Sequence, residues 1–252
     1  MLNWGLETWK WKYLVKKLEP MTFRTAGKSV LSGVAVSQLL PYRTGEYLGR
    51  LAYVSDKHKI AAGILSVAGS FSQLLVTLLF GIIGFVIIEP LPYPWYLILS
   101  FILLLALLLI GYFYMPQFKR LKTNRFFNAV REAFEPLDQK DFAVVLVLSV
   151  LRYASFVIPY ALIAQYFDLP PGAGLMYGMA SVACIYFLQT VSPNFILTDL
   201  VIRVTVPAMV FGAGSMAGLD NAYIPGMFIY VFNVAVPMCI GAVILLLAKL
   251  RK

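Results

Sequence analysis

The sequence predicts an all-α polytopic membrane protein, in which a helical bundle carries two re-entrant hairpins related as an inverted repeat. The first observation is composition: 60% of the residues are hydrophobic, 13% are charged and the mean hydropathy is +0.79, whereas soluble chains carry about 25% charge. The second is the length of the uncharged runs at 60–88 and 90–118, because about 20 apolar residues span a bilayer. These runs are continuous rather than alternating, which indicates helices and not a barrel.

The third observation is the placement of positive charge. Ten of the 21 Lys and Arg residues fall in 10–59, six fall in 119–140, and three close the chain after residue 248. By the positive-inside rule, these segments face the cytoplasm. We therefore expect a multi-pass protein of the cytoplasmic membrane with a cytoplasmic C-terminus. The net charge of +9 reflects this topology, and a nucleic-acid partner is not expected.

Connections without Lys or Arg then alternate with the basic ones and define the spans. We expect four full membrane spans, at 60–88, 95–116, 141–167 and 223–249. The whole chain, 1–252, is interpreted as one transmembrane domain. Its parts are a first half of about 1–118, a cytoplasmic connector at 119–140 and a second half of about 141–252.

Two further stretches, 22–42 and 174–212, each begin and end on one side of the predicted membrane. Each is interpreted as a re-entrant hairpin, the first entering from the cytoplasm and the second from outside. Both carry a glutamine, a proline, an acid and an arginine in the same order, at an offset of about 152 residues. These residues are Gln38, Pro41, Glu46 and Arg50 in the first hairpin, and Gln189, Pro193, Asp199 and Arg203 in the second. Inverted repeats with broken helices are a recurrent transporter architecture.

Charged residues at membrane depth are the candidate binding residues. Arg152 lies eleven residues beyond Asp141 in an apolar run, and an unpaired charge there costs roughly 2.5–3.5 kcal/mol on insertion scales. The acid and the arginine of each hairpin are four residues apart, a spacing that allows pairing along one helical face. Four arginines then face two acids, and the surplus suits an anionic headgroup, because guanidinium grips phosphate oxygens bidentately. The candidate headgroup-binding residues are Arg43, Glu46, Arg50, Arg152, Asp199 and Arg203. The alternative is that the pairs only neutralise each other and lock the hairpins.

Neutral polar residues add a weaker indication of a hydrated path. Ser66, Ser70, Gln73 and Thr77 form one stripe on the span at 60–88, although hydrogen bonding between helices explains such a stripe equally well. Asn233, close to Pro237, predicts a polar contact and a kink in the last span, although helix packing is the alternative explanation. The supporting polar path is assigned to Gln38, Ser70, Gln73, Gln189 and Asn233.

Other residues give no sign of catalysis. Cys184 and Cys239 are far apart in apolar runs and are interpreted as packed hydrophobes. The single histidine, His58, falls among charged residues and is expected to be a solvated loop residue. The sequence holds no Gly-rich phosphate loop and no HExxH motif. We therefore expect no enzyme activity, no cofactor and no metal site.

The N-terminal segment, rich in Trp and Lys, is interpreted as an interfacial helix or the inner end of a span. Its sequence "NWGLETWKWKYL", together with "SGVAVSQLLPYRTGEYLGR" and "SFSQLLVTLLFG", resembles the transmembrane-region family of lysylphosphatidylglycerol synthases, or flippase-like domain proteins. The most specific element is P-x-R-x-G-E followed by an arginine, here Pro41, Arg43, Gly45, Glu46 and Arg50. The resemblance implies a polytopic bundle with re-entrant helices. In full-length synthases this region moves aminoacylated phosphatidylglycerol between leaflets.

Three departures from the family pattern bear on function. The chain has no aminoacyltransferase domain, so it is expected to be a stand-alone member. The second hairpin reads "SPNFILTD" instead of the Gly-rich P-x-P-G-G form, which argues against a lysyl-lipid. Met1 falls at the inner half of what should be a first helix, so the sequence is expected to be truncated at its N-terminus.

The sequence therefore predicts a flippase-like protein that translocates an anionic phospholipid or a polyprenyl-phosphate-linked lipid. The alternative is a non-transporting membrane subunit that scaffolds an envelope glycosyltransferase or a lipid-synthesis enzyme. An intramembrane lipid-modifying enzyme is a weaker alternative, because the sequence offers no credible nucleophile or metal cluster.

Overall fold

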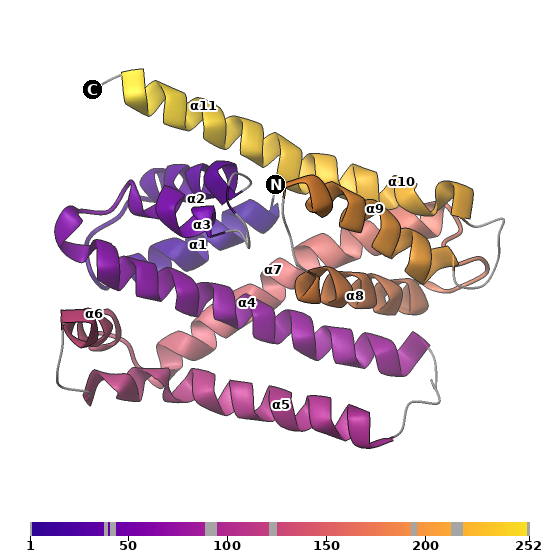
Figure 1. The fold of residues 1–252 in the computed structure, drawn as a ribbon, viewed down its shortest axis with the longest axis horizontal. Coiled ribbons are helices and arrows are strands. Elements are labelled where there is room, and N and C mark those ends of the chain that lie inside the picture. The colour runs from indigo at the N-terminus through magenta and orange to yellow at the C-terminus, as the bar shows by residue number, and fades with distance from the viewer. Residues whose placement is uncertain are drawn as a thin grey trace.

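The computed structural model shows an all-α protein (Figure 1). The described part of the chain contains α-helices, the short 3-10 helices η2 (Asp56–His58) and η3 (Met115–Arg120), one π-helical segment, and no strand. The structure describes residues 2–37, 40, 44–88, 95–120, 125–192, 196–212 and 219–250.

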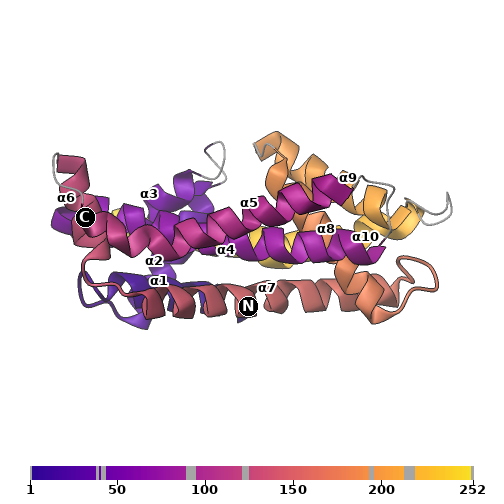
Figure 2. The ribbon, with the colours of Figure 1, turned by 90° about the horizontal axis from the view of Figure 1, so that it is seen from below.

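Four helical segments are long and apolar enough to cross a membrane, at 56–88, 99–117, 139–166 and 221–248. They correspond to the four expected spans, and the predicted class of an all-α polytopic membrane protein is confirmed. The helices that form them run along the long axis of the molecule (Figures 1 and 2). At about 1.5 Å per residue, the 30 residues of the first of these helices extend over roughly 45 Å. The helices are α4 (Lys59–Ile88), α5 (Trp95–Tyr114), α7 (Gln139–Tyr166), and the continuous run of α10 (Leu219–Tyr230), η5 (Val231–Ala235) and α11 (Val236–Leu250).

Shorter helices lie at the two ends of this long axis (Figure 1). One end holds α1 (Leu2–Val15), α2 (Phe23–Ser37), α3 (Gly45–Leu51) and α6 (Arg125–Phe134); the other holds α8 (Leu175–Val191) and α9 (Ile196–Gly212). Within these groups, α2 packs against α3 and α8 packs against α9. The stretch 174–212 thus contains the packed pair α8 and α9, whereas the stretch 22–42 contains only α2, and its packing partner α3 lies beyond the predicted bounds.

Small residues bring the arms of the first hairpin into close contact. A Cβ atom on Gly45 would lie 2.1 Å from the carbonyl oxygen of Val36, and one on Gly49 would lie 2.5 Å from that of Ser32. Real Cβ atoms do not approach backbone this closely, so neither position accepts a side chain without movement of α3. Glycines four residues apart on one helical face allow this kind of crossing.

The two halves of the chain exchange their packing partners. α4, which follows the first hairpin, packs against α8 of the second; α11, which follows the second hairpin, packs against α2 of the first. Both contacts use glycine: a Cβ on Gly84 would lie 2.7 Å from the Ala180 carbonyl oxygen, and one on Gly241 would lie 2.0 Å from that of Leu31. Each half of the chain thus contributes a helix that packs against a short helix of the other half.

The end of the molecule that carries α6 is held by polar contacts. Tyr13 donates a hydrogen bond of 2.5 Å to Asp141, and Lys17 forms an ion pair of 3.1 Å with the same carboxylate. The hydrogen bond to Asp141 is the main reason that the pKa of Tyr13 rises to about 12, with burial adding to it. His58 is not the solvated loop residue that the sequence suggests, because it contacts Glu132 and its side chain is only 17% exposed.

Candidate ligand-binding site

The N-terminal helix packs within the bundle along one of its faces. α1 packs against α2, α4 and α7. Trp11 is fully buried and donates a hydrogen bond of 2.9 Å from Nε1 to the Ser29 hydroxyl of α2. Trp9 on the opposite face stays exposed. The helix therefore presents one face, which carries Glu7 and Lys10, to the centre of the protein.

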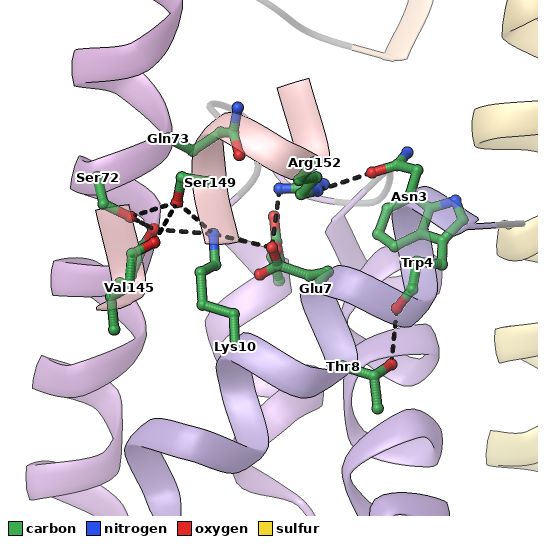
Figure 3. A network of polar contacts seen from close by, with 12 residues as sticks. Asn3, Trp4, Glu7, Thr8, Lys10, Ser72, Gln73, Val145, Ser149 and Arg152 are labelled. Atoms are coloured by element: carbon green, nitrogen blue, oxygen red, sulfur yellow. Dashed lines mark hydrogen bonds and ion pairs between the residues drawn. The ribbon is translucent and has the colours of Figure 1, made fainter. Parts of the chain in front are cut away.

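Glu7 is the centre of a buried ion cluster (Figure 3). Its Oε1 accepts a hydrogen bond of 2.7 Å from Nη2 of Arg50, and its Oε2 lies 2.9 Å from Nζ of Lys10 and 2.9 Å from Nη1 of Arg152. The Glu7 side chain is 1% exposed. Arg50 also contacts Glu46, as their spacing on α3 predicts. Helices α1, α3 and α7 are thus joined through one carboxylate.

This arrangement changes the charge count derived from the sequence. We expected the membrane-depth arginines to face only Glu46 and Asp199, and that expectation is wrong because it omits Glu7. Within the described cluster, the cations Lys10, Arg50 and Arg152 face the carboxylates of Glu7 and Glu46. One positive charge therefore remains in excess among these five residues. The three-residue spacing of Glu7 and Lys10 was the available signal, but the surrounding Trp and Lys residues favoured an interfacial reading.

Lys10 has a structural position in the cluster. Its ammonium group donates to the Gly69 carbonyl oxygen at 3.1 Å and to the Ser149 hydroxyl at 3.4 Å, and Ser149 lies 2.7 Å from the Ser72 hydroxyl (Figure 3). These contacts tie α1 to α4 and α7 and satisfy a buried charge, which would otherwise be costly. Lys10 lines neither of the cavities described below.

Arg152 differs from the other two cations because it reaches open space. Its side chain is 16% exposed, against 2% for Lys10 and 2% for Arg50. Nε donates a hydrogen bond of 2.8 Å to Oδ1 of Asn3, and the guanidinium carbon lies 5.4 Å from the centroid of the Trp4 ring. The excess positive charge of the cluster is therefore presented at Arg152.

Two polar cavities adjoin Arg152. The Arg203 cavity, of about 340 Å³, is lined by Arg203, Arg152 and residues of α1, α4, α7, α8 and the π-helical segment η5. The Glu46 cavity, of about 400 Å³, is lined by Glu46, Glu7, Arg152 and residues of α3, α4 and α8. Both cavities are lined by Gln73, Thr77, Arg152 and Thr190. Arg152 thus lies between two cavities that share part of their lining.

Most of the predicted residues that the structure describes line these cavities. Gln73 and Arg152 line both. Arg203, Gln189 and Asn233 line the Arg203 cavity, while Glu46 and Ser70 line the Glu46 cavity. Arg50 lines neither and instead holds the carboxylates of Glu7 and Glu46. Outside the described parts lie Gln38, Arg43 and the side chain of Asp199.

Asn233 lies in the π-helical segment η5 and lines the Arg203 cavity. A π-turn leaves helical carbonyl groups without their usual partners, and the Asn233 carbonyl oxygen accepts a hydrogen bond of 3.1 Å from Nε1 of Trp4. The irregularity predicted near Pro237 is therefore a π-turn just before it. In the described chain, no group of three His, Cys, Asp or Glu residues is arranged to hold a metal ion.

The apolar spans and the internal polar site define a polytopic membrane protein with a charged centre. The family model described as Lysylphosphatidylglycerol synthase TM region matches residues 1–198, so the chain belongs to this family. The match includes the whole ion cluster and ends within α9, before α10 and α11. Comparison with curated proteins and with solved structures returned no match.

Proposed function

We propose that this protein translocates an anionic phospholipid or a polyprenyl-phosphate-linked lipid across the cytoplasmic membrane. The observation that carries the proposal is the position of Arg152, which lines both cavities and forms an ion pair with the buried Glu7. The headgroup would pass through the two cavities, and the tails would remain in the surrounding lipid.

Charge balance supports an anion as the ligand. The described cluster carries one excess positive charge, and Arg152 presents it to the cavities. A phosphodiester at Arg152 would neutralise this charge, and Glu7 would keep its contacts with Lys10 and Arg50. Arg203 lines the same cavity and supplies a second guanidinium. Such groups bind phosphate oxygens through paired, charge-assisted hydrogen bonds.

Alternating access would use the two hairpins as re-entrant elements. The α2–α3 pair would enter from the cytoplasmic side, the α8–α9 pair would enter from the outside, and the ion cluster would lie between them. The contacts of α4 with α8 and of α11 with α2 join the two halves, so the halves would rock against each other along these contacts. This movement would expose Arg152 to each side in turn.

A lipid-flipping assay in proteoliposomes tests the proposal. We expect the wild-type protein to move fluorescent anionic lipid between leaflets and the Arg152→Gln variant to lose this activity. Arg131→Gln is the matched control, because Arg131 is an exposed residue of α6 that pairs with Glu135 and with no other carboxylate among the described residues. The Glu7→Gln/Arg152→Gln double variant provides the same test if the single variant fails to fold, because it removes a cation and a carboxylate together and keeps the charge balance of the cluster.

Unchanged flipping by folded Arg152→Gln and double variants would contradict the proposal. Absence of lipid movement by the folded wild-type protein, together with co-purification of an envelope glycosyltransferase or lipid-synthesis enzyme, would support a scaffolding subunit instead.

A further inference from the structure

The Arg203 cavity has a lining that goes beyond what a phosphate group needs. Two guanidinium groups suffice to hold an anion, yet four primary amides also line this space of about 340 Å³. That volume falls within the range of small-ligand sites, roughly 300–1,000 Å³. The four amides come from α1, α4, α8 and η5 and belong to Asn3, Gln73, Gln189 and Asn233.

Gln73 is the clearest sign of a polar ligand. Both atoms of its amide are buried, and neither has a hydrogen-bond partner in the parts of the chain that the structure describes. Buried polar groups in native proteins are nearly always paired. Gln73 lies beside Arg152 at the boundary of the two cavities (Figure 3), so a ligand phosphate at Arg152 would bring its substituent within reach of this amide.

Two more amides have hydrogen-bonding capacity to offer. Asn233 contacts Trp4 through its backbone carbonyl, and its side chain makes no hydrogen bond to the described residues. Asn3 accepts from Arg152 through Oδ1, which leaves its NH₂ group to donate. A primary amide supplies two donors and one acceptor oxygen, a combination that matches hydroxyl groups, which both donate and accept.

Aromatic rings form the apolar part of the lining. Phe156 and Tyr186 contact each other edge to face with centroids 4.7 Å apart, and the indole of Trp4 is fixed by its hydrogen bond to η5. Flat apolar faces between fixed polar groups orient a ligand that is polar at its edges and apolar on its faces. A sugar or cyclic polyol ring has this character.

We infer that the Arg203 cavity takes a phosphodiester headgroup whose second substituent is a sugar or a cyclic polyol ring. The phosphate would bind Arg152 and Arg203, and the hydroxyl groups would bind the amides of Gln73 and Asn233. The inference rests on the proposed lipid-translocating function and names the headgroup class. The same chemistry could come from a phosphatidyl-polyol or from a glycosyl-phospho-polyprenol.

Binding to the full chain in phosphatidylcholine nanodiscs tests the inference. The probes are phosphatidylinositol, a glucosyl-phospho-polyprenol, and phosphatidylmethanol, which carries the same phosphodiester charge without hydroxyl groups. Native mass spectrometry gives the relative affinity of each. We expect at least one of the two hydroxyl-rich lipids to bind about tenfold or more tightly than phosphatidylmethanol, as the loss of two hydrogen bonds predicts. The stronger of the two identifies the source of the headgroup.

Variants separate the hydroxyl contacts from the phosphate contacts. Gln73→Leu and Asn233→Leu should each lower the ratio of the affinity for the hydroxyl-rich lipid to the affinity for phosphatidylmethanol. Arg152→Gln should weaken all anionic probes alike. Gln165→Leu is the control, because Gln165 is an exposed glutamine of α7 that lines neither cavity.

The failure of this inference is distinguishable from failure of the proposed function. Equal binding of all three probes, lost in Arg152→Gln, would overturn the polyol assignment and leave the anionic lipid site intact. A preference that persists in Gln73→Leu and Asn233→Leu would also overturn it. If none of the probes binds in an Arg152-dependent manner, both proposals are contradicted.

Discussion

Glu7 of α1 and Arg152 of α7 form an ion pair of 2.9 Å, although 145 residues separate them in the sequence. Glu7 is buried by the contacts of α1 with α2, α4 and α7, whereas Arg152 faces two cavities. The pair therefore connects the structural centre of the protein with the space where a ligand would bind. The predictions below follow from this connection and from the packing that supports it.

Removal of the Glu7 charge alone should strongly destabilise the fold. Glu7→Gln leaves Lys10, Arg50 and Arg152 close together without their shared carboxylate, and breaking such a buried pair costs about 3–5 kcal/mol. The Glu7→Gln/Arg152→Gln double variant should recover a large part of this loss, because it also removes one cation. Thermal unfolding of the purified variants in detergent measures both effects. Additive losses in the double variant would show that the two charges are not coupled.

Alanine at Gly45 should open the first hairpin. The added methyl group would lie 2.1 Å from the Val36 carbonyl oxygen, and overpacking of this kind costs about 1–3 kcal/mol. Gly111→Ala is the control, since a Cβ at Gly111 in α5 meets no atom within 4 Å. That substitution should be neutral or stabilising by about 0.5–1 kcal/mol. Equal melting temperatures for the two variants would contradict the close packing of α2 and α3.

The reciprocal packing of the two halves predicts matching effects at two distant glycines. Gly84→Ala would disturb the contact of α4 with Ala180 in α8, and Gly241→Ala would disturb the contact of α11 with Leu31 in α2. Both variants should unfold at lower temperature than Gly111→Ala, and both should slow lipid flipping. An effect at Gly84 with none at Gly241 would argue that the contact of α4 with α8 and the contact of α11 with α2 are not equivalent.

The contact between Tyr13 and Asp141 predicts a dependence of stability on alkaline pH. The pKa of Tyr13 is raised from 10.0 to about 12 in the folded protein, so folding stabilises the protonated phenol. This contribution is fully present below pH 10 and is lost as the pH rises through about 12. The stability difference between wild type and Tyr13→Phe should therefore shrink between pH 10 and pH 12. A difference that stays constant over this range would exclude the hydrogen bond as its cause.

The sequence was sufficient to locate the four spans, because an uncharged run of about 20 residues or more is long enough to cross the bilayer as a helix. It also identified Arg152, since an arginine far from any charged end cannot reach water easily. Pairing of Glu46 with Arg50 followed from helical spacing alone. All three inferences depend on local sequence or on distance from a charge.

The sequence did not place Glu7 or Lys10, because their burial depends on contacts with α4 and α7 that are distant in the chain. A short helix rich in Trp and Lys has the composition of an interfacial segment, and only tertiary packing separates the two cases. The sequence predicted a kink near Pro237 but not the π-turn at Asn233, for a similar reason. Its carbonyl is paired by Trp4 from the opposite end of the chain, and no local pattern predicts that partner.

The most direct test of the central claim is the lipid that stays bound to the purified protein. Lipid extraction and mass spectrometry of the wild-type protein should show an anionic lipid enriched over the bulk membrane. The enrichment should disappear in Arg152→Gln and persist in Arg131→Gln. An identical lipid composition in all three proteins would contradict a headgroup site at Arg152.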